Sequence, residues 1–322
     1  MVHDMRICYG LAGGDNTDRA GCAPSAVALG FFDGVHLGHR RILDALVSRG
    51  RELGLRTCVY TFVNQPASVF GVDRKARLLC DNRLKAEYIA EAGVDELCFD
   101  WFDLKLSRLA PEEFVRSVLV GKFNARLVCA GENYTFGADG RGDSALLSAL
   151  GRVNGFETLI LPSLSAELDG GNVTVSSTVL RQLTAAGRFR EYERLAGHPF
   201  RLEGTVVHGR EVGRTIGFPT ANLLPPRGIV LPACGVYATR TAIRGTDLVF
   251  KSITNVGSNP TFADTGGVTV ETHLLDHDGA LYGAELRLDF LERLRGEKVF
   301  SGPDALSAQL TADASKRAQM DL

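Results

Sequence analysis

Apolar and polar positions divide the chain into two halves with different periodicity. Up to about residue 183, short and almost continuously apolar runs alternate with longer amphipathic stretches. Continuously apolar runs separated by helices are typical of a parallel sheet covered on both faces. We therefore predict a doubly wound, Rossmann-like α/β domain, whose ligands bind beyond the carboxyl ends of its strands. The expected strands are residues 26–31, 56–62, 96–99, 126–130 and 158–161, and the expected helices are residues 37–53, 83–92, 111–120 and 142–151.

The pattern changes near Gly187. A helix is expected over residues 188–196, and Gly197-His198-Pro199 ends it. The runs that follow are short and closely punctuated by Gly and Pro, which predicts a small antiparallel β-barrel or sandwich with a terminal helix over residues 304–316. The change of pattern near Gly187 predicts a domain boundary there, with an N-terminal domain of residues 1–186 and a C-terminal domain of residues 187–322. The expected strands are residues 204–208, 236–241, 248–256, 268–275 and 286–290.

Composition narrows the class of protein. The 322 residues suffice for two domains, and the net charge of -2 argues against an extended nucleic-acid surface. We expect no membrane span, because no run is long and apolar enough, and the N-terminus lacks the apolar run of a signal peptide. The seven cysteines are scattered and odd in number, as in a reducing compartment. We therefore expect a cytoplasmic protein.

The first candidate site follows the first expected strand. Gly30, Gly34 and Gly38 punctuate a turn into a helix, where backbone N–H groups and the helix dipole favour an anion. His36 and His39 share one helical face and suit the oxygens of an α-phosphate during adenylyl transfer. Judged by spacing alone, the two histidines would be ordinary residues of a helix surface or core. The surrounding glycines Gly30, Gly34 and Gly38 favour the phosphate-binding role. No third ligand for zinc is evident nearby.

Ser176, Ser177 and Thr178 form a hydroxyl-rich helix start in the same half. Such hydroxyls cap a helix and also donate hydrogen bonds to phosphate, although capping alone is their usual role. Arg181 follows one turn later and is either a phosphate ligand or a solvated surface charge.

The second candidate site lies in the C-terminal half, which contains no Walker sequence. A glycine-punctuated loop follows an expected strand, and Thr220 and Asn222 then point the same way along an extended segment. Their neutral oxygen atoms fit a Mg²⁺ ion that binds mainly through phosphates. The alternative is a Pro-Thr turn that Asn222 closes. The loop residues expected to bind nucleotide or substrate are Gly209, Gly213, Arg214, Phe218 and Pro219.

Several ordered motifs together resemble the bacterial bifunctional riboflavin kinase/FMN adenylyltransferases (FAD synthetases). In the first half, Gly-Phe-Phe-Asp-Gly-Val-His-Leu-Gly-His from Gly30 looks like the family's nucleotidyltransferase signature. The resemblance continues at Gly-Glu-Asn-Tyr-Thr-Phe-Gly from Gly131 and at Val-Ser-Ser-Thr from Val175. In the second half, Phe-Pro-Thr-Ala-Asn from Phe218, Asn-Val-Gly-Ser-Asn-Pro-Thr-Phe from Asn255 and the segment around Glu271 resemble the riboflavin kinase domain.

The resemblance implies roles for particular residues. The first-half segments would converge on ATP and FMN, with Gly30, Phe31, Asp33, Gly38 and Asn133 among the binding residues, although Asp33 first shapes its turn. Glu271 matches the base that takes the proton of the riboflavin 5′-hydroxyl, and Asn255 lies in a binding motif. Adenylyl transfer needs no such base, because the FMN phosphate is already largely ionised.

The implied function is phosphorylation of riboflavin to FMN with Mg-ATP, followed by adenylylation of FMN to FAD with release of pyrophosphate. One departure opens an alternative, because Gln65 stands where the family usually has a histidine near the ATP phosphates. A kinase with a weakened or retuned transferase is therefore a second hypothesis. A flavin-binding sensor is a third, and Thr220, Asn222 and Glu271 count against it, since binding alone needs no base.

Overall fold

The computed structural model describes residues 5–10, 23–70, 77–209, 213, 217–258 and 268–321. The chain divides into two compact units, Met1–Ala76 with Asp81–Ser176, and Arg77–Cys80 with Ser177–Leu322. The division after Ser176 comes earlier than residue 187, where the sequence pattern changes, and the domain boundary at that residue stays a prediction.

The first unit contains the predicted parallel sheet. Its strand order is β1-β4-β3-β2-β5-β6, and every neighbouring pair is parallel. The chain moves outward in one direction from β2 to β3 and then returns to the other side of β2 with β5, so the strand order reverses there. Ligands bind at such a reversal, beyond the carboxyl ends of the strands. The strands are β1 (Arg6–Tyr9), β2 (Ser25–Leu29), β3 (Arg56–Phe62), β4 (Glu96–Asp100), β5 (Ala125–Gly131) and β6 (Glu157–Leu161).

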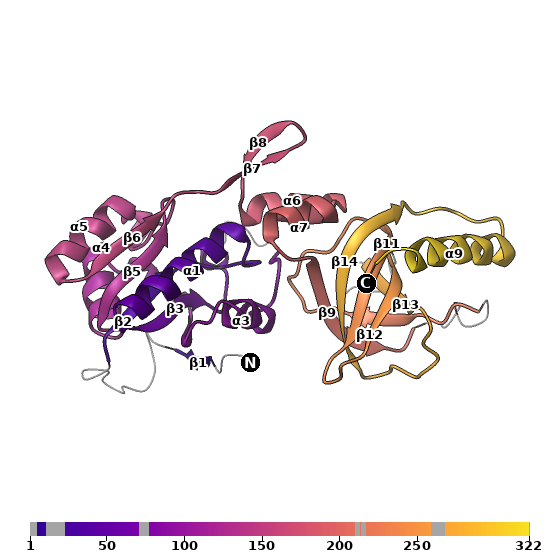
Figure 1. Ribbon diagram of the computed structural model, residues 1–322, viewed down its shortest axis with the longest axis horizontal. Coiled ribbons are helices and arrows are strands. Elements are labelled where there is room, and N and C mark those ends of the chain that lie inside the picture. Colours follow the sequence, from indigo (N-terminus) through magenta and orange to yellow (C-terminus); the bar gives the residue numbers. More distant parts are fainter. Residues whose placement is uncertain are drawn as a thin grey trace. The chain divides into compact units, whose positions relative to one another are not determined.

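Helices cover both faces of this sheet, which confirms the doubly wound fold (Figure 1). On one face, α1 approaches so closely that a Cβ at Gly50 would lie 2.6 Å from Thr57 Cγ2. On the other, Val27 and Cys58 pack into a core with residues of α4 and α5. A small antiparallel hairpin, β7–β8, follows the sheet. The elements are α1 (Leu37–Glu52), α2 (Pro66–Val69), α3 (Asn82–Ala90), α4 (Pro111–Phe114), α5 (Ser144–Asn154), β7 (Ser165–Leu168) and β8 (Gly171–Thr174), with 3-10 turns at Leu106–Arg108 and Ala138–Gly140.

The helix expected over residues 111–120 is α-helical only in its first turn. From Val115–Val120 the backbone forms a π-helix, and the Gly121 N–H donates to the Arg116 carbonyl at 2.9 Å, five residues back.

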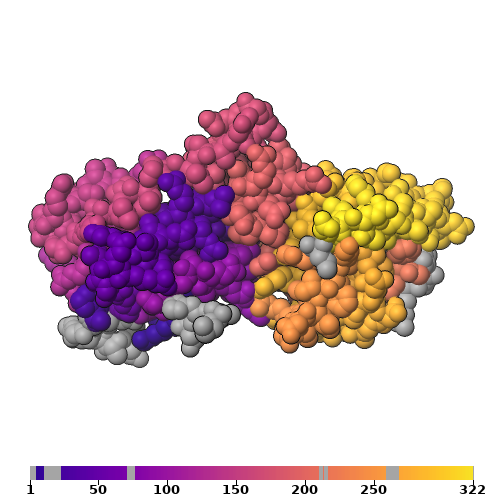
Figure 2. All heavy atoms as spheres, viewed as in Figure 1, coloured from indigo at the N-terminus to yellow at the C-terminus, as the bar shows by residue number. Residues whose placement is uncertain are grey.

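The second unit is a closed antiparallel barrel with the strand order β10-β13-β12-β11-β14-β9. It confirms the barrel over the sandwich. The helix α9 lies against the barrel (Figure 2). The buried guanidinium of Arg317 on α9 donates to the Thr239 carbonyl at 2.8 Å. The elements are α6 (Ser177–Ala186), α7 (Phe189–Ala196), β9 (Phe200–Val207), β10 (Ala221–Leu224), β11 (Gly235–Ile243), β12 (Val249–Ser258), β13 (Val268–Leu274), β14 (Glu285–Arg295) and α9 (Pro303–Ala318).

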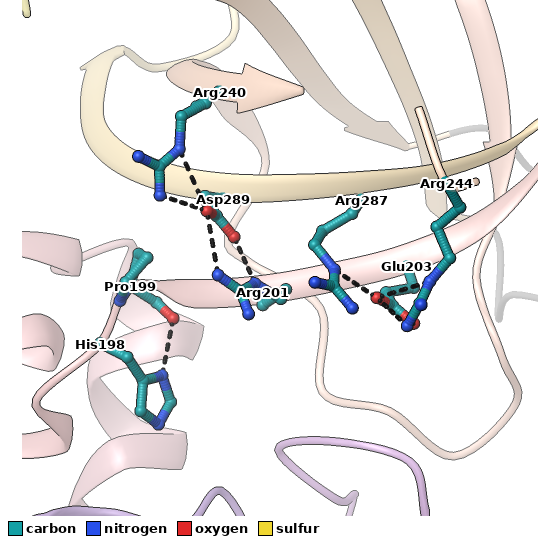
Figure 3. A network of polar contacts seen from close by, with 8 residues as sticks. All are labelled: His198, Pro199, Arg201, Glu203, Arg240, Arg244, Arg287 and Asp289. Carbon is teal, nitrogen blue, oxygen red and sulfur yellow. Dashed lines mark hydrogen bonds and ion pairs between the residues drawn. The ribbon is translucent and has the colours of Figure 1, made fainter. Parts of the chain in front are cut away.

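Charged residues are part of the strands that build one side of the barrel. Asp289 on β14 accepts from Arg201 on β9 and Arg240 on β11, and Glu203 accepts from Arg244 and Arg287 (Figure 3). Strand β9 begins at Phe200, four residues before its expected start at residue 204. The charged residues Arg201 and Glu203 belong to the strand because they pair with Asp289 and Arg287 on β14.

Candidate active sites

The chain leaves β2 through a strained turn. All five residues of β2 are buried, and a Cβ on Gly30 would lie 2.9 Å from the Phe32 ring. Phe32 and Val35 both have positive φ angles, 53° and 34°, as does Gly34 at 73°. A positive φ is a clear outlier for a β-branched residue, and such strain is typical of functional sites. Asp33 is buried inside the turn, and Phe31 is partly exposed beside it.

The two predicted histidines lie together at the start of α1. The Nδ1 atom of His36 accepts from the His39 backbone N–H at 3.3 Å, so the proton of the neutral His36 ring resides on Nε2. The two rings stack with centroids 3.7 Å apart. A Cβ on Gly38 would lie only 3.1 Å from the His36 ring, so a larger residue between the histidines would push that ring aside.

His39 is held neutral. Burial lowers its pKa well below the usual value of 6.5, and the neighbouring His36 and Lys85 lower it further. Its Nδ1 atom is buried without a hydrogen-bond partner in the structure. An uncharged His39 imidazole at the positive end of a helix suits hydrogen bonding to phosphate oxygens, with the positive charge supplied by other groups.

Lys85 on α3 was not singled out from the sequence. Its side chain is buried, with Nζ 4.1 Å from the centre of the Phe31 ring and 3.4 Å from the Phe62 carbonyl, to which it donates. A buried lysine beside the first motif is therefore a further functional candidate. The sequence carried a signal, because Lys85 shares its helical face with the apolar positions Tyr88 and Ile89.

The hydroxyl-rich segment begins beside the histidines. The Val175 carbonyl lies 3.8 Å from the position that a Cβ on Gly38 would occupy. Because Ser176 is the next residue, its backbone lies near the start of α1. The structure thus brings the predicted Ser176 near the first motif. Ser177, Thr178 and Arg181 lie on α6, in the second compact unit, and their contacts with phosphate stay a prediction.

Asn133 follows the end of β5, at the same edge of the sheet. Its side chain is exposed and donates to the Ser163 hydroxyl at 3.0 Å, after the end of β6. The carboxyl ends of β2 and β5 therefore carry predicted residues, as the reversal of strand order implies.

Gln65 immediately precedes α2, and its backbone carbonyl accepts from the Ser68 N–H and hydroxyl. The neighbouring Asn64 fixes the segment, because its amide exchanges two hydrogen bonds with the Phe102 backbone, both at 2.9 Å. These contacts, which hold the backbone around position 65, do not involve the Gln65 side chain.

The second site is built across three strands. Asn222 on β10 and Asn255 on β12 both lie directly opposite Glu271 on β13. Directly opposed residues project from the same face of a sheet. That face is the outside of the barrel, because Val270 and Thr272 beside Glu271 are buried in its interior.

A cavity of about 320 Å³ lies over Glu271 and Asn255 of this row, and Asn222 is not part of its lining. Thr220, Asn255 and Glu271 line it from the barrel, and Leu306 and Leu310 line it from α9. The outward carboxylate is thus enclosed by apolar and polar groups, as in a small-molecule site. The remaining lining residues are Gly213, Phe218, Val236, Ile253, His273, Arg295, Glu297, Lys298 and Phe300.

Two glycines let the loop approach the site closely. A Cβ on Gly209 would lie 2.0 Å from Asn222 Nδ2, and one on Gly213 would lie 2.2 Å from the Phe218 carbonyl oxygen. The Phe218 N–H donates back to the Gly213 carbonyl at 2.8 Å. Arg214, predicted to bind nucleotide, lies outside the described residues.

His273 and Arg295 are site residues that the sequence did not reveal. The His273 ring bonds the Pro219 carbonyl through Nδ1 at 2.7 Å and packs against Phe218, so it fixes the segment before Thr220. Arg295 lines the cavity and donates to Asp313 of α9 at 2.8 Å, which fastens the helix that closes it.

Comparison with known proteins assigns each half to a family model. The model "FAD synthetase" matches residues 19–179, and the model "Riboflavin kinase" matches residues 196–320. Among the described residues, none of the helices is long and apolar enough to cross a membrane.

Curated relatives match nearly the full chain. The bifunctional riboflavin kinase/FMN adenylyltransferase of Escherichia coli (strain K12) is 36% identical, over 96% of both chains. Its namesakes from Listeria monocytogenes and Bacillus subtilis are 36% and 31% identical, over 89% and 90% of both chains. A solved structure described as a macrolide-efflux protein from Streptococcus pneumoniae is 28% identical, with a TM-score of 0.86 over 98% of this chain and 100% of that one.

Proposed function

Because this chain belongs to the family of bifunctional riboflavin kinases/FMN adenylyltransferases, we propose how its residues divide the two ATP-dependent steps between the units. The protein phosphorylates riboflavin to FMN and adenylylates FMN to FAD. The hypothesis of a weakened transferase is not favoured, since the FAD synthetase model spans the departure at Gln65.

We propose that Glu271 is the base of the kinase. A primary alcohol is a poor nucleophile, and a carboxylate in the cavity wall takes its proton as the oxygen attacks the terminal phosphate of ATP. The carrying observation is the row of Asn222, Glu271 and Asn255, opposed across three strands beside the cavity. The apolar wall from α9 excludes water, which would compete as acceptor.

Thr220 and Asn222, beside Glu271, fit a magnesium ion. Thr220 and Asn222 offer neutral oxygen atoms from one face of an extended segment, and the missing Cβ of Gly209 leaves the Asn222 amide its place. When bound, Mg²⁺ would neutralise charge on the ATP phosphates. The protein side chains orient that ion and hold the alcohol beside Glu271.

In the transferase, we propose that His36 and the neutral His39 donate hydrogen bonds to the α-phosphate. Lys85 stabilises the same turn, where negative charge grows on the equatorial oxygens as pyrophosphate leaves. Ser176 contacts the other phosphates, and the same role for Ser177, Thr178 and Arg181 stays a prediction from the family resemblance. The FMN phosphate is the nucleophile and needs no base.

The cysteines that the structure describes are free thiols, which supports a reducing, cytoplasmic compartment for the enzyme.

The test uses two substrates with one variant. Wild-type protein with Mg-ATP should convert riboflavin to FMN and FAD, and supplied FMN to FAD. Glu271→Gln should lower FMN formation from riboflavin by about 10²-fold or more while FAD formation from supplied FMN continues. The surface variant Glu112→Gln serves as control. Loss of both activities in a folded Glu271→Gln protein would contradict two independent sites.

A further inference from the structure

Two thiols and a carboxylate converge on the edge of the parallel sheet, before the carboxyl ends of the strands where the adenylyl site lies. Cys8 on β1 lies directly opposite Cys98 on β4, with the two Sγ atoms 2.8 Å apart. Glu96 projects from the same face of β4, and its Oε1 atom lies 3.3 Å from Cys8 Sγ and 3.2 Å from Cys98 Sγ. All three potential ligand atoms lie within 4.8 Å of one another.

The carboxylate is held in place for this contact. Glu96 is buried, and its other oxygen, Oε2, forms an ion pair with Arg56 from the neighbouring strand β3. A ligand carboxylate is commonly oriented in this way by a partner that binds its second oxygen. Oε1 therefore points at the two sulfurs with little freedom to turn away.

We propose that Cys8, Cys98 and Glu96 bind a thiophilic divalent cation of the Zn²⁺ or Cd²⁺ class. Two sulfurs and one carboxylate oxygen are ligands of borderline and soft metals, and they leave a fourth tetrahedral position for water. Both thiols release their protons to solvent as two metal–sulfur bonds form, and no electron is transferred. Tetrahedral ligands with Zn–S bonds of ~2.3 Å lie about 3.8 Å apart, so the sulfurs need to separate by about 1 Å.

Access and placement agree with a structural ion. Cys8 is partly exposed on the edge strand, which gives an entry path, whereas Cys98 is fully buried. The ion would join β1 to the rest of the sheet. The residues lie before the carboxyl ends of their strands, where the adenylyl site is, so the ion takes no part in that reaction.

A disulfide between the two cysteines is the competing use of this geometry. Oxidation would remove both S–H donors and leave the buried Oε1 atom of Glu96 without these two hydrogen bonds, at a cost of about 1–3 kcal/mol for a buried acceptor. Metal binding instead satisfies the same oxygen. The carboxylate therefore favours the cation.

The experiment titrates the reduced, metal-free full chain with Co²⁺ in excess Mg²⁺, which occupies sites built from oxygen ligands. One equivalent of Co²⁺ should produce thiolate-to-cobalt absorption, and Zn²⁺ should displace it. Cys8→Ser should weaken Co²⁺ binding by about 10²-fold, as loss of one of three ligands does. Cys129→Ser, which removes a buried thiol on β5, is the matched control and should bind Co²⁺ as the wild type does.

A second measurement guards against misfolding. Zn²⁺ should raise the unfolding temperature of wild-type protein and leave that of Cys8→Ser unchanged, while both make FAD from FMN. Absence of the thiolate band in fully reduced wild type would overturn the proposal, and so would equal Co²⁺ affinity in Cys8→Ser. Formation of the Cys8–Cys98 disulfide by diamide at the same rate with and without Zn²⁺ would identify a redox pair and also overturn it.

Discussion

Asn222 lies directly opposite Glu271 on the barrel, and the backbone of Gly209 passes so close to its amide that a Cβ there would lie 2.0 Å from Nδ2. Asn222, the proposed metal ligand, and Glu271, the proposed base, are thus neighbours on one face of the barrel. Gly209, in the loop after β9, sets the position of the Asn222 side chain.

We predict that Gly209→Ala impairs only the kinase. The added methyl group displaces the Asn222 amide, so FMN formation should fall at least about tenfold and require more Mg²⁺ for half-maximal rate. Gly302→Ala in the same unit is the control, because a Cβ there meets open space. The measurement is the rate of FMN formation against Mg²⁺ concentration. An unchanged Mg²⁺ requirement would remove Asn222 from the metal site.

Lys85 should matter for FAD formation and not for FMN formation. Lys85→Met keeps the length of the side chain and removes its charge, so adenylyl transfer should slow by about 10²-fold. Lys122→Met, a lysine after the π-helix of the same unit, is the control. If Lys85 served folding alone, Lys85→Met would lower the unfolding temperature and leave the catalytic rate of the folded fraction intact.

His39 makes the first unit sensitive to acid. Its pKa is depressed in the folded state, so the unfolded chain binds the proton more readily. Its contribution to stability is therefore fully present above the unfolded value near 6.5 and is lost as pH falls from there toward the lower folded pKa. Urea unfolding of the wild type and His39→Asn between pH 7.5 and 5 should show a steeper loss for the wild type. Parallel slopes would contradict this account.

Asp289 should be costly to remove. It is buried between Arg201 and Arg240, and Asp289→Ala leaves two cations close together without their acceptor. We expect the free energy of unfolding of the second unit to fall by about 3 kcal/mol. Asp247→Ala, at an exposed turn, should change it by less than about 0.5 kcal/mol. Unfolding of the wild type, Asp289→Ala and Asp247→Ala, measured side by side, tests this difference. Equal losses in the two variants would contradict it.

Much of the fold was predictable because its strands carry strong patterns. The strand Arg56–Phe62 has the bounds that its apolar run predicts, since a central parallel strand is buried on both faces. β1 and β10 escaped prediction because each has four residues, and β1 is largely exposed at the sheet edge. β1 becomes a strand by pairing with β4, and local sequence does not encode that pairing.

The sites were predicted unevenly for a similar reason. His36, Gly38 and Ser176 meet in space because the turn after β2 and the segment before α6 lie at one sheet edge, which the strand pattern already implies. Lys85 was missed although it shares the helical face of Tyr88 and Ile89, because a lysine in a helix is usually solvated and only the tertiary fold buries it. The enclosure of Glu271 likewise depends on α9, which lies far along the chain from β13.

The positive φ of Val35 bears on how this enzyme responds to laboratory selection. Glycine or asparagine at that position adopts the same backbone without the clash of a β-branched side chain, so a screen for heat resistance should enrich such changes there. Because glycine and asparagine also populate other backbone conformations more readily than valine does, the turn that holds His36 would become less rigid. Val35 is therefore a position where selection for heat resistance and selection for FAD production pull in opposite directions.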